Sequence, residues 1–389
     1  MHDATSVPGQ RYDAVVVGAR CAGAATAMLL ARGGLSVLLV DRARHGADTL
    51  STLALMRAGV LQLHRWGLLD RVRAAGTPAI TSTSFIYGEE ATTVPIKSRD
   101  GVDALYAPRR WLIDSMLADA AADAGAEVVY RSRLVDLERT SDGRVVGATI
   151  AESGGAVRRI RSDIVIGADG RRSTVARLVE AATCRESGNA CGVVYAFWPA
   201  LENARSRWFY RTGCAAGAIP TNNGDACVFV ATPQARFQDE IRNDAKAGYR
   251  RVLAECAPEL AGEVAQKVPS EPPRSFPGQP GLIRQSYGPG WALVGDAGYF
   301  KDPITAHGIT DALRDAELLA RAVLRGSYPA LAEYQSTRDG LSSKLFEITD
   351  TIAGFQWDLD SLKTLHLDLS TVMNGEVEAL LAIDTTRGG

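Results

Sequence analysis

The chain has 389 residues, of which 46% are hydrophobic and 23% are charged, with 38 Gly and 16 Pro. These fractions are ordinary for a globular protein and indicate neither a disordered nor a membrane-embedded chain. The length allows two to three domains, or one composite domain with insertions. Lysine plus arginine (43) nearly balance aspartate plus glutamate (45), which leaves a formal charge of −2. Because nothing forms a basic patch, nucleic acid is not an expected partner.

The cysteines and the first residues set further limits. The six cysteines, at positions 21, 184, 191, 214, 227 and 256, include no C-x-x-C pair and no Cys/His run with zinc spacing. We therefore expect free thiols and no metal site. The opening residues MHDATSVPGQRYD lack the regions of a signal peptide, and no apolar run approaches the ~18 residues of a membrane span. The sequence predicts a soluble, cytoplasmic protein.

The N-terminal part predicts a βαβ unit. Residues 12–17 (YDAVVV) form a β-branched run typical of a buried parallel strand. Small and apolar residues at helical spacing follow up to Gly33-Gly34, and residues 35–42 (LSVLLVDR) predict a second buried strand. Residues 48–76 are predicted to be helical. The Thr/Ser/aromatic alternation of residues 81–106 predicts strands of a different sheet.

The middle of the chain continues the mixture of helices and strands. A helix is predicted over residues 108–125, a hairpin turn at Asp142-Gly143 and another buried strand over 163–170. Alternating apolar and aromatic residues predict further strands over 190–232, and residues 234–265 are predicted to be helical.

The C-terminal part begins with a Pro-rich loop over residues 269–281, followed by a last predicted strand over 291–298. A long helix is expected to start near Pro303. Residues 341–385 have the apolar periodicity of an amphipathic helix.

A glycine-rich loop after the first strand indicates a dinucleotide site. Such a site needs a tight turn, a close approach of the backbone to the pyrophosphate and a helix N-terminus that faces the anion. Residues 18–23 read G-A-R-C-A-G and carry the first and third glycines of the G-x-G-x-x-G template, with Arg20 at the second. Asp41, at the end of the second strand, is placed to accept from ribose hydroxyls. The alternative is a glycine turn that only packs a helix against a sheet.

A second motif lies near the C-terminus. Gly295-Asp296 ends a predicted strand, and Pro303 and Gly308 precede a long helix whose N-terminal amides would face a negative group. The Asp296 carboxylate can bind the hydroxyls of a ribityl chain, which NAD lacks. Taken alone, the stretch is equally compatible with a strand–turn–helix capped by Asp302.

Together these motifs resemble the FAD-dependent aromatic hydroxylase superfamily, typified by para-hydroxybenzoate hydroxylase, which also contains geranylgeranyl reductases and flavin-dependent halogenases. Residues 18–41 match its ADP-binding unit, residues 163–177 (DIVIGADGRRSTVAR) its central Asp-Gly motif, and residues 295–308 its C-terminal Gly-Asp motif. The resemblance spans about residues 12–340. It implies FAD bound tightly but without a covalent bond.

The resemblance also implies which residues touch FAD. Arg110 would contact the diphosphate or ribose, the Leu134 backbone would lie by the adenine, and Asp169 would lie near the flavin. Arg42 would help hold the adenosine ribose. The expected FAD-binding residues are Gly18, Arg20, Cys21, Ala22, Gly23, Asp41, Arg42, Arg110, Leu134, Asp169, Gly295, Asp296, Pro303, Gly308 and Ile309. NADPH or NADH would bind only transiently, because the sequence has no second nucleotide-binding βαβ unit.

The expected fold class is α/β, with a Rossmann-like FAD-binding domain built on a parallel sheet, a mostly antiparallel substrate-binding sheet interleaved with it, and a C-terminal helical tail. The expected segments are 1–80, 105–182 and 283–340 for the FAD-binding domain, 81–104 and 183–282 for the substrate-binding domain, and 341–389 for the helical tail.

Two departures from the family pattern matter. The stretch that matches the W-x-W-x-I-P motif of halogenases reads CAAGAIP at residues 214–220, which argues against halogenation because both Trp are missing. Arg20 replaces the second glycine of the phosphate loop. Its Cβ would push the loop back, whereas a guanidinium beside a pyrophosphate could compensate electrostatically.

The second sheet is expected to contact a small-molecule aromatic or hydrophobic substrate. With a period of two, Tyr195 and Phe197 share one face of a strand and Trp198 lies on the other. The candidates for substrate contact are Tyr195, Phe197 and Tyr210. The alternative is that these rings pack against helices behind the sheet.

His307 is the candidate catalytic residue. It precedes Gly308 in the loop expected to touch the flavin, and an imidazole suits proton transfer near neutral pH. Its alternative role is a hydrogen bond to the backbone. His45 and His64 are weaker candidates, and Cys21 is expected to be a small packing residue.

The leading functional prediction is an FAD-dependent monooxygenase of secondary metabolism. It would hydroxylate or oxidise an aromatic or polycyclic small molecule through a flavin C4a-hydroperoxide, with NAD(P)H as reductant and molecular oxygen as co-substrate. The alternatives are a flavin-dependent reductase or dehydrogenase of an isoprenoid or other apolar substrate, and a non-redox FAD-containing cyclase. The sequence leaves open the substrate, the choice between NADH and NADPH, a separate flavin reductase, and the oligomeric state.

Overall fold

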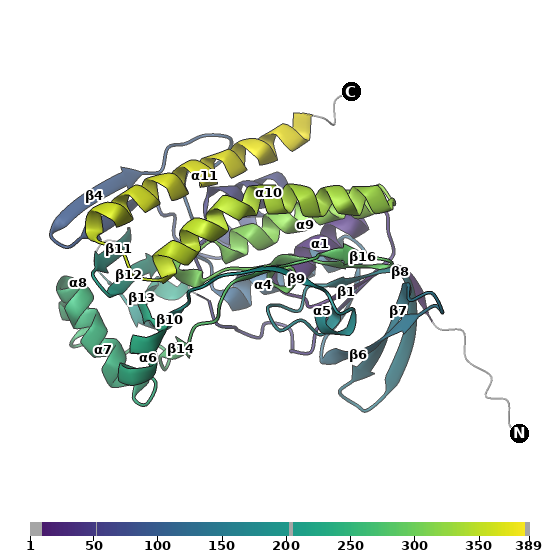
Figure 1. Cartoon of the computed structure of the whole chain (residues 1–389), viewed down its shortest axis with the longest axis horizontal. Coiled ribbons are helices and arrows are strands. Elements are labelled where there is room, and N and C mark those ends of the chain that lie inside the picture. The colour runs from purple at the N-terminus through teal and green to yellow at the C-terminus, as the bar shows by residue number, and fades with distance from the viewer. Residues whose placement is uncertain (1–9, 52, 202–204, 386–389) are drawn as a thin grey trace, which may run out of the picture.

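The computed structural model describes residues 10–51, 53–201 and 205–385, and it has the predicted α/β fold (Figure 1). Two large sheets form the body of the molecule. Two long C-terminal helices, α10 (Tyr328–Ala353) and α11 (Leu359–Thr385), pack on one another and run along one side of it (Figure 1). None of the helices in the described ranges combines the length and the apolar character needed to cross a membrane.

The first sheet has eight strands and a parallel centre in the order β17-β8-β1-β2-β5. The parallel strands are β1 (Arg11–Val17), β2 (Val37–Val40), β5 (Glu127–Val129), β8 (Val157–Gly167) and β17 (Trp291–Leu293). Antiparallel pairing adds β16 (Tyr287–Gly288), β6 (Ser132–Arg139) and β7 (Val145–Glu152). The hairpin turn predicted at Asp142-Gly143 is confirmed, since it joins β6 to β7.

The register of the parallel strands places their carboxyl ends at one edge of the sheet. Val17 lies beside both Val40 and Gly167, and Gly167 in turn lies beside Leu293. The loops that follow these four strands therefore emerge together. In an open parallel sheet this edge forms the ligand crevice.

Helices cover the first sheet. They include α1 (Cys21–Arg32), α2 (Arg57–Arg65), α3 (Leu69–Ala74), α4 (Arg110–Asp123), α5 (Thr174–Leu178) and α9 (Gly308–Leu324). The small residues Ala24, Ala25 and Ala27 of α1 are fully buried, so that α4 and α9 pack closely on it. The prediction of one helical stretch over 48–76 is wrong in part. The described residues before α2 are not helical, and Gly67, with a φ of 74°, separates α2 from α3.

The second sheet has seven strands in the order β14-β10-β13-β12-β11-β3-β4. Their bounds are β3 (Ser82–Tyr87), β4 (Glu90–Pro95), β10 (Cys191–Pro199), β11 (Ser206–Arg211), β12 (Cys214–Pro220), β13 (Asp225–Pro233) and β14 (Arg274–Phe276). The strands predicted within 81–106 join this sheet, because β3 pairs with β11. A third, small sheet contains β9 (Thr183–Glu186), β15 (Leu282–Arg284) and β18 (Tyr299–Phe300).

The two faces of the second sheet enter different cores, as the period of two predicts. Tyr195 and Phe197 belong to the core on the side of the C-terminal helices, whereas Trp198 belongs to the core beneath the outer helices. Those outer helices are α6 (Gln234–Glu240), α7 (Ala245–Cys256) and α8 (Pro258–Val264). The helical stretch predicted over 234–265 is thus three helices, because Asp244 caps α7 and Pro258 begins α8.

The C-terminal tail also differs from its prediction as one helix over 341–385. Helix α10 begins earlier, at Tyr328, and ends at Ala353. Gly354 caps it, Phe355 has a positive φ of 54°, and the chain turns into α11. Leu362 of α11 enters the core under the second sheet. His366 of α11 contacts the Tyr87 hydroxyl through Nδ1 at 2.7 Å. Helix α11 therefore closes the inner face of that sheet.

The burial of His366 predicts a pH dependence of stability. Burial lowers the pKa of His366 to about 4. In the unfolded chain a histidine binds a proton near its ordinary pKa of about 6.5, so acidification from pH 7 to pH 4 stabilises the unfolded state by up to about 3 kcal/mol. We expect His366→Asn, which keeps an acceptor for the Tyr87 hydroxyl, to lose less stability over this range in urea unfolding.

His45→Asn is the matched control, because His45 is about half exposed in its ion pair with Asp119. Its loss of stability should follow the wild type. If His366→Asn lost as much stability between pH 7 and pH 4 as the wild type, His366 would not be the source of this pH dependence.

Candidate functional site

A cavity of about 730 Å³ lies at the carboxyl edge of the first sheet, within the size range of small-molecule and cofactor sites. Its walls come from both large sheets. Gly18, Asp41 and Asp169 follow strands of the first sheet, whereas Val193 and Tyr195 belong to β10 of the second. One space therefore connects the predicted cofactor loops to the predicted substrate sheet.

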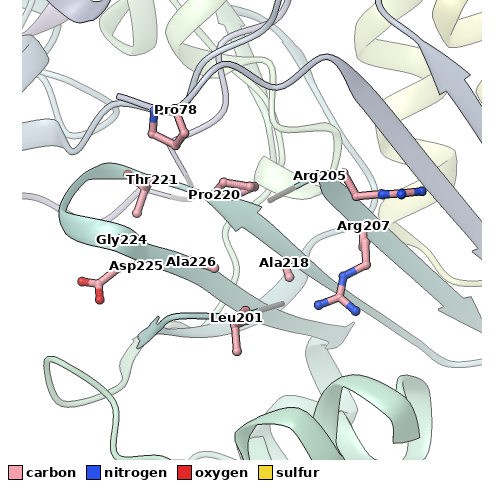
Figure 2. Close-up of a pocket in the computed structure, with 10 residues that line it drawn as sticks. All are labelled: Pro78, Leu201, Arg205, Arg207, Ala218, Pro220, Thr221, Gly224, Asp225 and Ala226. Atoms are coloured by element: carbon pink, nitrogen blue, oxygen red, sulfur yellow. The ribbon is translucent and has the colours of Figure 1, made fainter. Parts of the chain in front are cut away.

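A smaller cavity of about 120 Å³ lies over β12 and β13 (Figure 2). Arg207 lines it, and its guanidinium is already bound by both carboxylate oxygens of Glu263, at 2.5 and 2.8 Å. Its described lining includes no predicted site residue.

The two glycines of the phosphate loop are required by close backbone packing. Gly18 has a φ of 108°, and a Cβ on it would lie 2.4 Å from the carbonyl oxygen of Ala168. A Cβ on Gly23 would lie 1.8 Å from the carbonyl oxygen of Gly18. These glycines let α1 begin directly at the end of β1, so that its N-terminus faces the cavity.

Arg20, Cys21 and Ala22 all line the cavity, and an aspartate fixes this turn from behind. Asp114 of α4 accepts hydrogen bonds through Oδ1 from the backbone N–H of Cys21 at 3.1 Å and from its Sγ at 3.0 Å. It also accepts from the guanidinium of Arg110 at 3.0 Å. Burial raises the pKa of the Cys21 thiol well above its usual value, which fits the predicted packing role.

Two guanidinium groups give this end of the cavity a positive charge. Arg20 and Arg110 both line it. Arg110 is bound to Asp114, whereas the Arg20 side chain has no hydrogen bond or ion pair with any of the described residues. Burial and then the charge of Arg110 lower the pKa of Arg20. A diphosphate between the two groups would replace their repulsion with charge-assisted hydrogen bonds. Arg20 thus supplies charge where the family template has a glycine.

Asp41 holds the neighbouring loop. Its two carboxylate oxygens accept from the backbone N–H of Ala19 and of Ala43, each at 2.7 Å. Each oxygen keeps a further acceptor position for a ribose hydroxyl. Arg42 and Leu134 also line the cavity.

Asp169 and Asp296 lie on the loops after β8 and β17, and both line the cavity. Asp169 accepts from the backbone N–H of Thr174, the first residue of α5, at 2.6 Å, while Ser173 caps that helix. Asp296 lies in the single turn 295–297, and burial raises its pKa while Arg110 opposes that shift. Gly295 has a φ of 59°, and a Cβ on it would lie 2.7 Å from that of Ala22.

The start of α9 faces the same cavity. Pro303, Gly308 and Ile309 line it, so the free amides of the first helical turn are directed at the site. Asp302 fixes the preceding loop, because it accepts from the backbone N–H of Ile304 at 2.9 Å and from that of Cys191 of β10 at 2.7 Å. Asp302 therefore caps the short turn 303–305, whereas α9 itself begins at Gly308 without a side-chain cap.

The residues around the cavity fit FAD. A glycine cradle and two guanidiniums suit a diphosphate, Asp41 suits a ribose, and Asp296 and the α9 amides offer an acceptor and donors that would suit a ribityl chain and a flavin.

His307 does not face this cavity. Its side chain is fully buried, with Nδ1 3.1 Å from Asp311 and Nε2 3.0 Å from Glu376 of α11. The expectation that the imidazole meets the substrate is therefore corrected. His45 pairs with Asp119 on the surface, and His64 packs against Gly101.

The three aromatic residues predicted to contact the substrate have different surroundings. Tyr195 lines the cavity, and its hydroxyl accepts from the backbone N–H of Ser51 at 3.0 Å. Phe197 lies under the guanidinium of Arg109, 3.5 Å from the ring centroid. Tyr210 is buried against His366, with ring centroids 4.8 Å apart. Phe197 and Tyr210 thus follow the packing alternative.

Several lining residues were missed by the sequence reasoning. Residues 49–51 and 53–54 line the cavity in an irregular segment that was predicted to be helical, and the motifs contain no signal for them. Lys301 and Asp311 also line it and form a buried ion pair. Their positions within and just after the Gly-Asp motif could have indicated them.

The packing of Gly23 yields a direct test. We expect Gly23→Ala to abolish FAD binding or reduce FAD affinity at least about a hundredfold, because the new methyl group must displace the Gly18 backbone or the start of α1. Flavin fluorescence on titration with FAD measures this. Gly262→Ala is the control, since a Cβ on this exposed residue of α8 meets nothing within 4 Å. Normal FAD binding by Gly23→Ala would contradict the site.

Comparison with known proteins identifies the family. Residues 11–348 match the model of the FAD binding domain family. The chain is 29% identical over 329 residues to the digeranylgeranylglycerophospholipid reductase of Methanothrix thermoacetophila, covering 81% of this chain and 79% of the relative. It is 28% identical over 332 residues to the menaquinone reductase of Mycolicibacterium smegmatis, covering 81% and 77%.

Solved structures share the fold. The flavin-dependent brominase Bmp2 superposes with a TM-score of 0.78 and 20% identity, covering 97% of this chain and 100% of its own. PqsL, a probable FAD-dependent monooxygenase from Pseudomonas aeruginosa, superposes with a TM-score of 0.74 and 21% identity, covering 94% and 100%. With the phosphate loop and the Gly-Asp loop meeting in one cavity, the match over residues 11–348 shows that the chain belongs to the FAD binding domain family of flavin-dependent oxidoreductases.

Proposed function

We propose that the protein is an FAD-dependent monooxygenase that oxidises an aromatic or polycyclic small molecule, with NAD(P)H as the source of electrons and molecular oxygen as co-substrate. The observation that supports this proposal is that one cavity extends from the predicted FAD-binding loops to an apolar wall. That wall contains Leu53, Val193, Tyr195, Phe276 and Phe300. Bound FAD would supply the electron transfer between NAD(P)H, oxygen and the substrate.

The residues of the chain would hold and polarise the cofactor. Arg20 and Arg110 neutralise the diphosphate, and Asp296 accepts from the ribityl hydroxyls. The amides of Gly308 and Ile309, at the positive end of α9, stabilise negative charge that develops in the cavity on reduction.

The irregular segment before α2 would exclude water from the substrate end. It is tied to the second sheet at two points. Ser51 donates its N–H to Tyr195, and Asp48 pairs with Arg274 of β14 at 2.9 Å. A dry pocket prevents side reactions of reactive groups.

A second candidate keeps the cofactor and changes the reaction. The curated relatives named above are reductases of a digeranylgeranylglycerophospholipid and of menaquinone. The apolar wall that suits a polycyclic ring also suits an isoprenoid chain. A flavin-dependent reductase of an isoprenoid-bearing substrate is therefore the alternative.

The first test is the visible spectrum of the purified protein, followed anaerobically as NADPH and then NADH are added. We expect a flavin spectrum that bleaches with one of the two nucleotides. Oxygen is then admitted with a panel of aromatic compounds, and in parallel isoprenoid quinones and polyprenyl lipids are offered without oxygen.

The outcomes separate the candidates. Oxygen uptake that forms a hydroxylated product supports the monooxygenase. Anaerobic reoxidation of the flavin by an isoprenoid substrate, with loss of one double bond, supports the reductase. Absence of flavin even after incubation with FAD would overturn both.

A further inference from the structure

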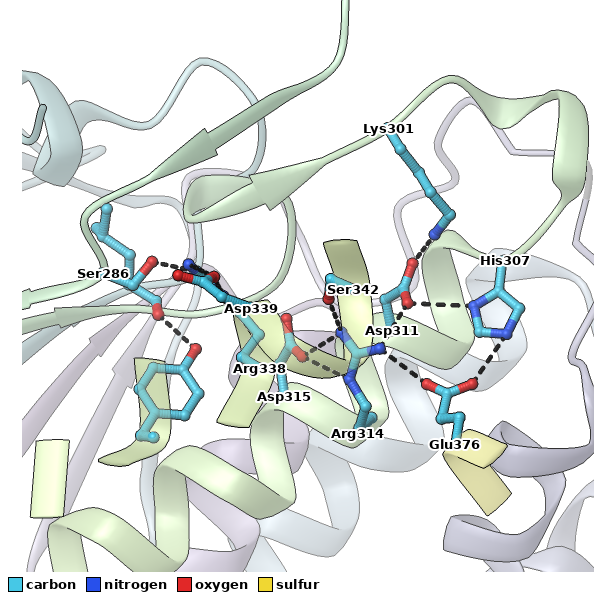
Figure 3. A network of polar contacts seen from close by, with 12 residues as sticks. Ser286, Lys301, His307, Asp311, Arg314, Asp315, Arg338, Asp339, Ser342 and Glu376 are labelled. Carbon is cyan, nitrogen blue, oxygen red and sulfur yellow. Dashed lines mark hydrogen bonds and ion pairs between the residues drawn. The ribbon is translucent and has the colours of Figure 1, made fainter. Parts of the chain in front are cut away.

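A cluster of charged side chains is buried beneath the start of α9 (Figure 3). It contains Lys301, His307, Asp311, Arg314, Asp315 and Glu376, and we call it the ion cluster. Each of these side chains is 4% exposed or less. Glu376 comes from α11, beyond residues 11–348 that the family model matches. Burying charged groups costs free energy, so these side chains are stable there only because opposite charges lie next to one another.

The contacts form a continuous chain. Lys301 pairs with Asp311, which also contacts Nδ1 of His307 at 3.1 Å. Nε2 of His307 lies 3.0 Å from Glu376, and Arg314 binds Glu376 at 2.9 Å. Figure 3 shows this path from Lys301 to α11. The imidazole has a carboxylate at each nitrogen, a geometry in which both nitrogens donate only when it is protonated.

The charges of the ion cluster balance only when every base is protonated. The three carboxylates are Asp311, Asp315 and Glu376, and the three bases are Lys301, His307 and Arg314. Arg314 stays charged, so the proton content depends on Lys301 and His307. Loss of a proton from either leaves one negative charge without a partner.

The polar and charged groups around the ion cluster have partners of their own. Ser342 of α10 accepts from Arg314 at 2.9 Å. Arg338, also of α10, pairs with Asp339. Tyr299 of β18 lies under Lys301, 5.1 Å from its Nζ to the ring centroid. Asp296, on the loop after β17, also lines the cavity and faces the positive charges of Arg110, Lys301 and Arg171.

Lys301 and Asp311 connect the ion cluster to the cavity, because both line it beside Pro303 and Ile309. Burial, and then the charge of Arg314, lower the pKa of Lys301 to about 7, whereas Glu376 raises it. Burial also lowers the pKa of His307. A negative charge that appears in the cavity would favour the protonated amine, and the buried setting strengthens that effect.

We propose that Lys301 takes up a proton from solvent when the bound FAD is reduced, and that Asp311, His307 and Glu376 are positioning residues for this ammonium group. Each two-electron reduction places negative charge in the cavity, and one proton binds Lys301 Nζ in compensation. Since it presupposes bound FAD, this role rests on the proposed function. It is independent of whether the electrons later reach oxygen or an isoprenoid.

A metal ion is a poorer occupant of the same place. His307, Asp311 and Glu376 offer three ligand atoms within 4.8 Å of one another. Lys301 and Arg314 already bind these carboxylates, so an added cation would meet two positive charges at contact distance.

The test is the pH dependence of the FAD midpoint potential in the reconstituted protein, measured by equilibration with reference dyes. Its slope gives the number of protons bound per two electrons. Above about pH 7 we expect one proton more in the wild type than in Lys301→Met and Lys301→Arg. Lys301→Arg keeps the positive charge but does not titrate, so it separates proton uptake from a structural defect.

Two variants of α11 complete the design. Glu376→Gln removes a charge that raises the pKa of Lys301, so the range of extra proton uptake should shift to lower pH, by about 1 pH unit or more. Glu378→Gln, on an exposed position of the same helix, should follow the wild type. Identical slopes in the wild type and both Lys301 variants would overturn the proposal. Absence of bound FAD in the wild type would instead overturn the proposed function itself, before any potential is compared.

Discussion

The close contact between the end of β1, the start of α1 and the loop after β8 governs the rest of the site. With no Cβ at Gly18 or Gly23, the first turn of α1 lies against the backbone of Gly18 and Ala168. Helix α1 then packs against α4 and α9, and its amides point to the edge where four parallel strands end. A single added methyl group at Gly23 would separate these layers. Backbone packing therefore determines where the cavity lies, independently of the side chains that line it.

Three aspartates then fix the loops that packing alone would leave free. Asp114 ties the phosphate loop to α4, Asp41 ties it to the loop after β2, and Asp302 ties the Gly-Asp loop to β10 of the second sheet. A buried carboxylate needs partners, and here backbone N–H groups donate to Asp114 and Asp302 while the guanidinium of Arg110 binds Asp114. These contacts hold the loops of the first sheet and strand β10 of the second sheet at fixed relative positions around the cavity.

The C-terminal helix α11 has two roles in this arrangement. Its first half covers the inner face of the second sheet, where Leu362 and His366 pack against aromatic side chains. Its second half carries Glu376 into the ion cluster beneath α9. The same helix thus packs against the second sheet and places a carboxylate beside Arg314 and His307 at the start of α9. Within this largely exposed helix, Leu362, Glu376, Val377 and Leu380 are the side chains that reach the interior.

The sequence alone determined the β1–α1–β2 unit, the phosphate loop with Asp41, and the Gly-Asp loop before α9. In each of these the pattern is local, because a β-branched strand, a glycine turn and a helix start lie within a few residues of one another. It also assigned Tyr195 and Trp198 to opposite faces of β10, because alternation is a property of the strand itself. The tertiary structure decided the rest. The His307 side chain contacts Glu376 and does not line the cavity. Tyr210 is covered by α11, and Lys301 pairs with Asp311. Those outcomes depend on charges and rings brought together from distant segments, and pairing between distant segments leaves no trace in local periodicity.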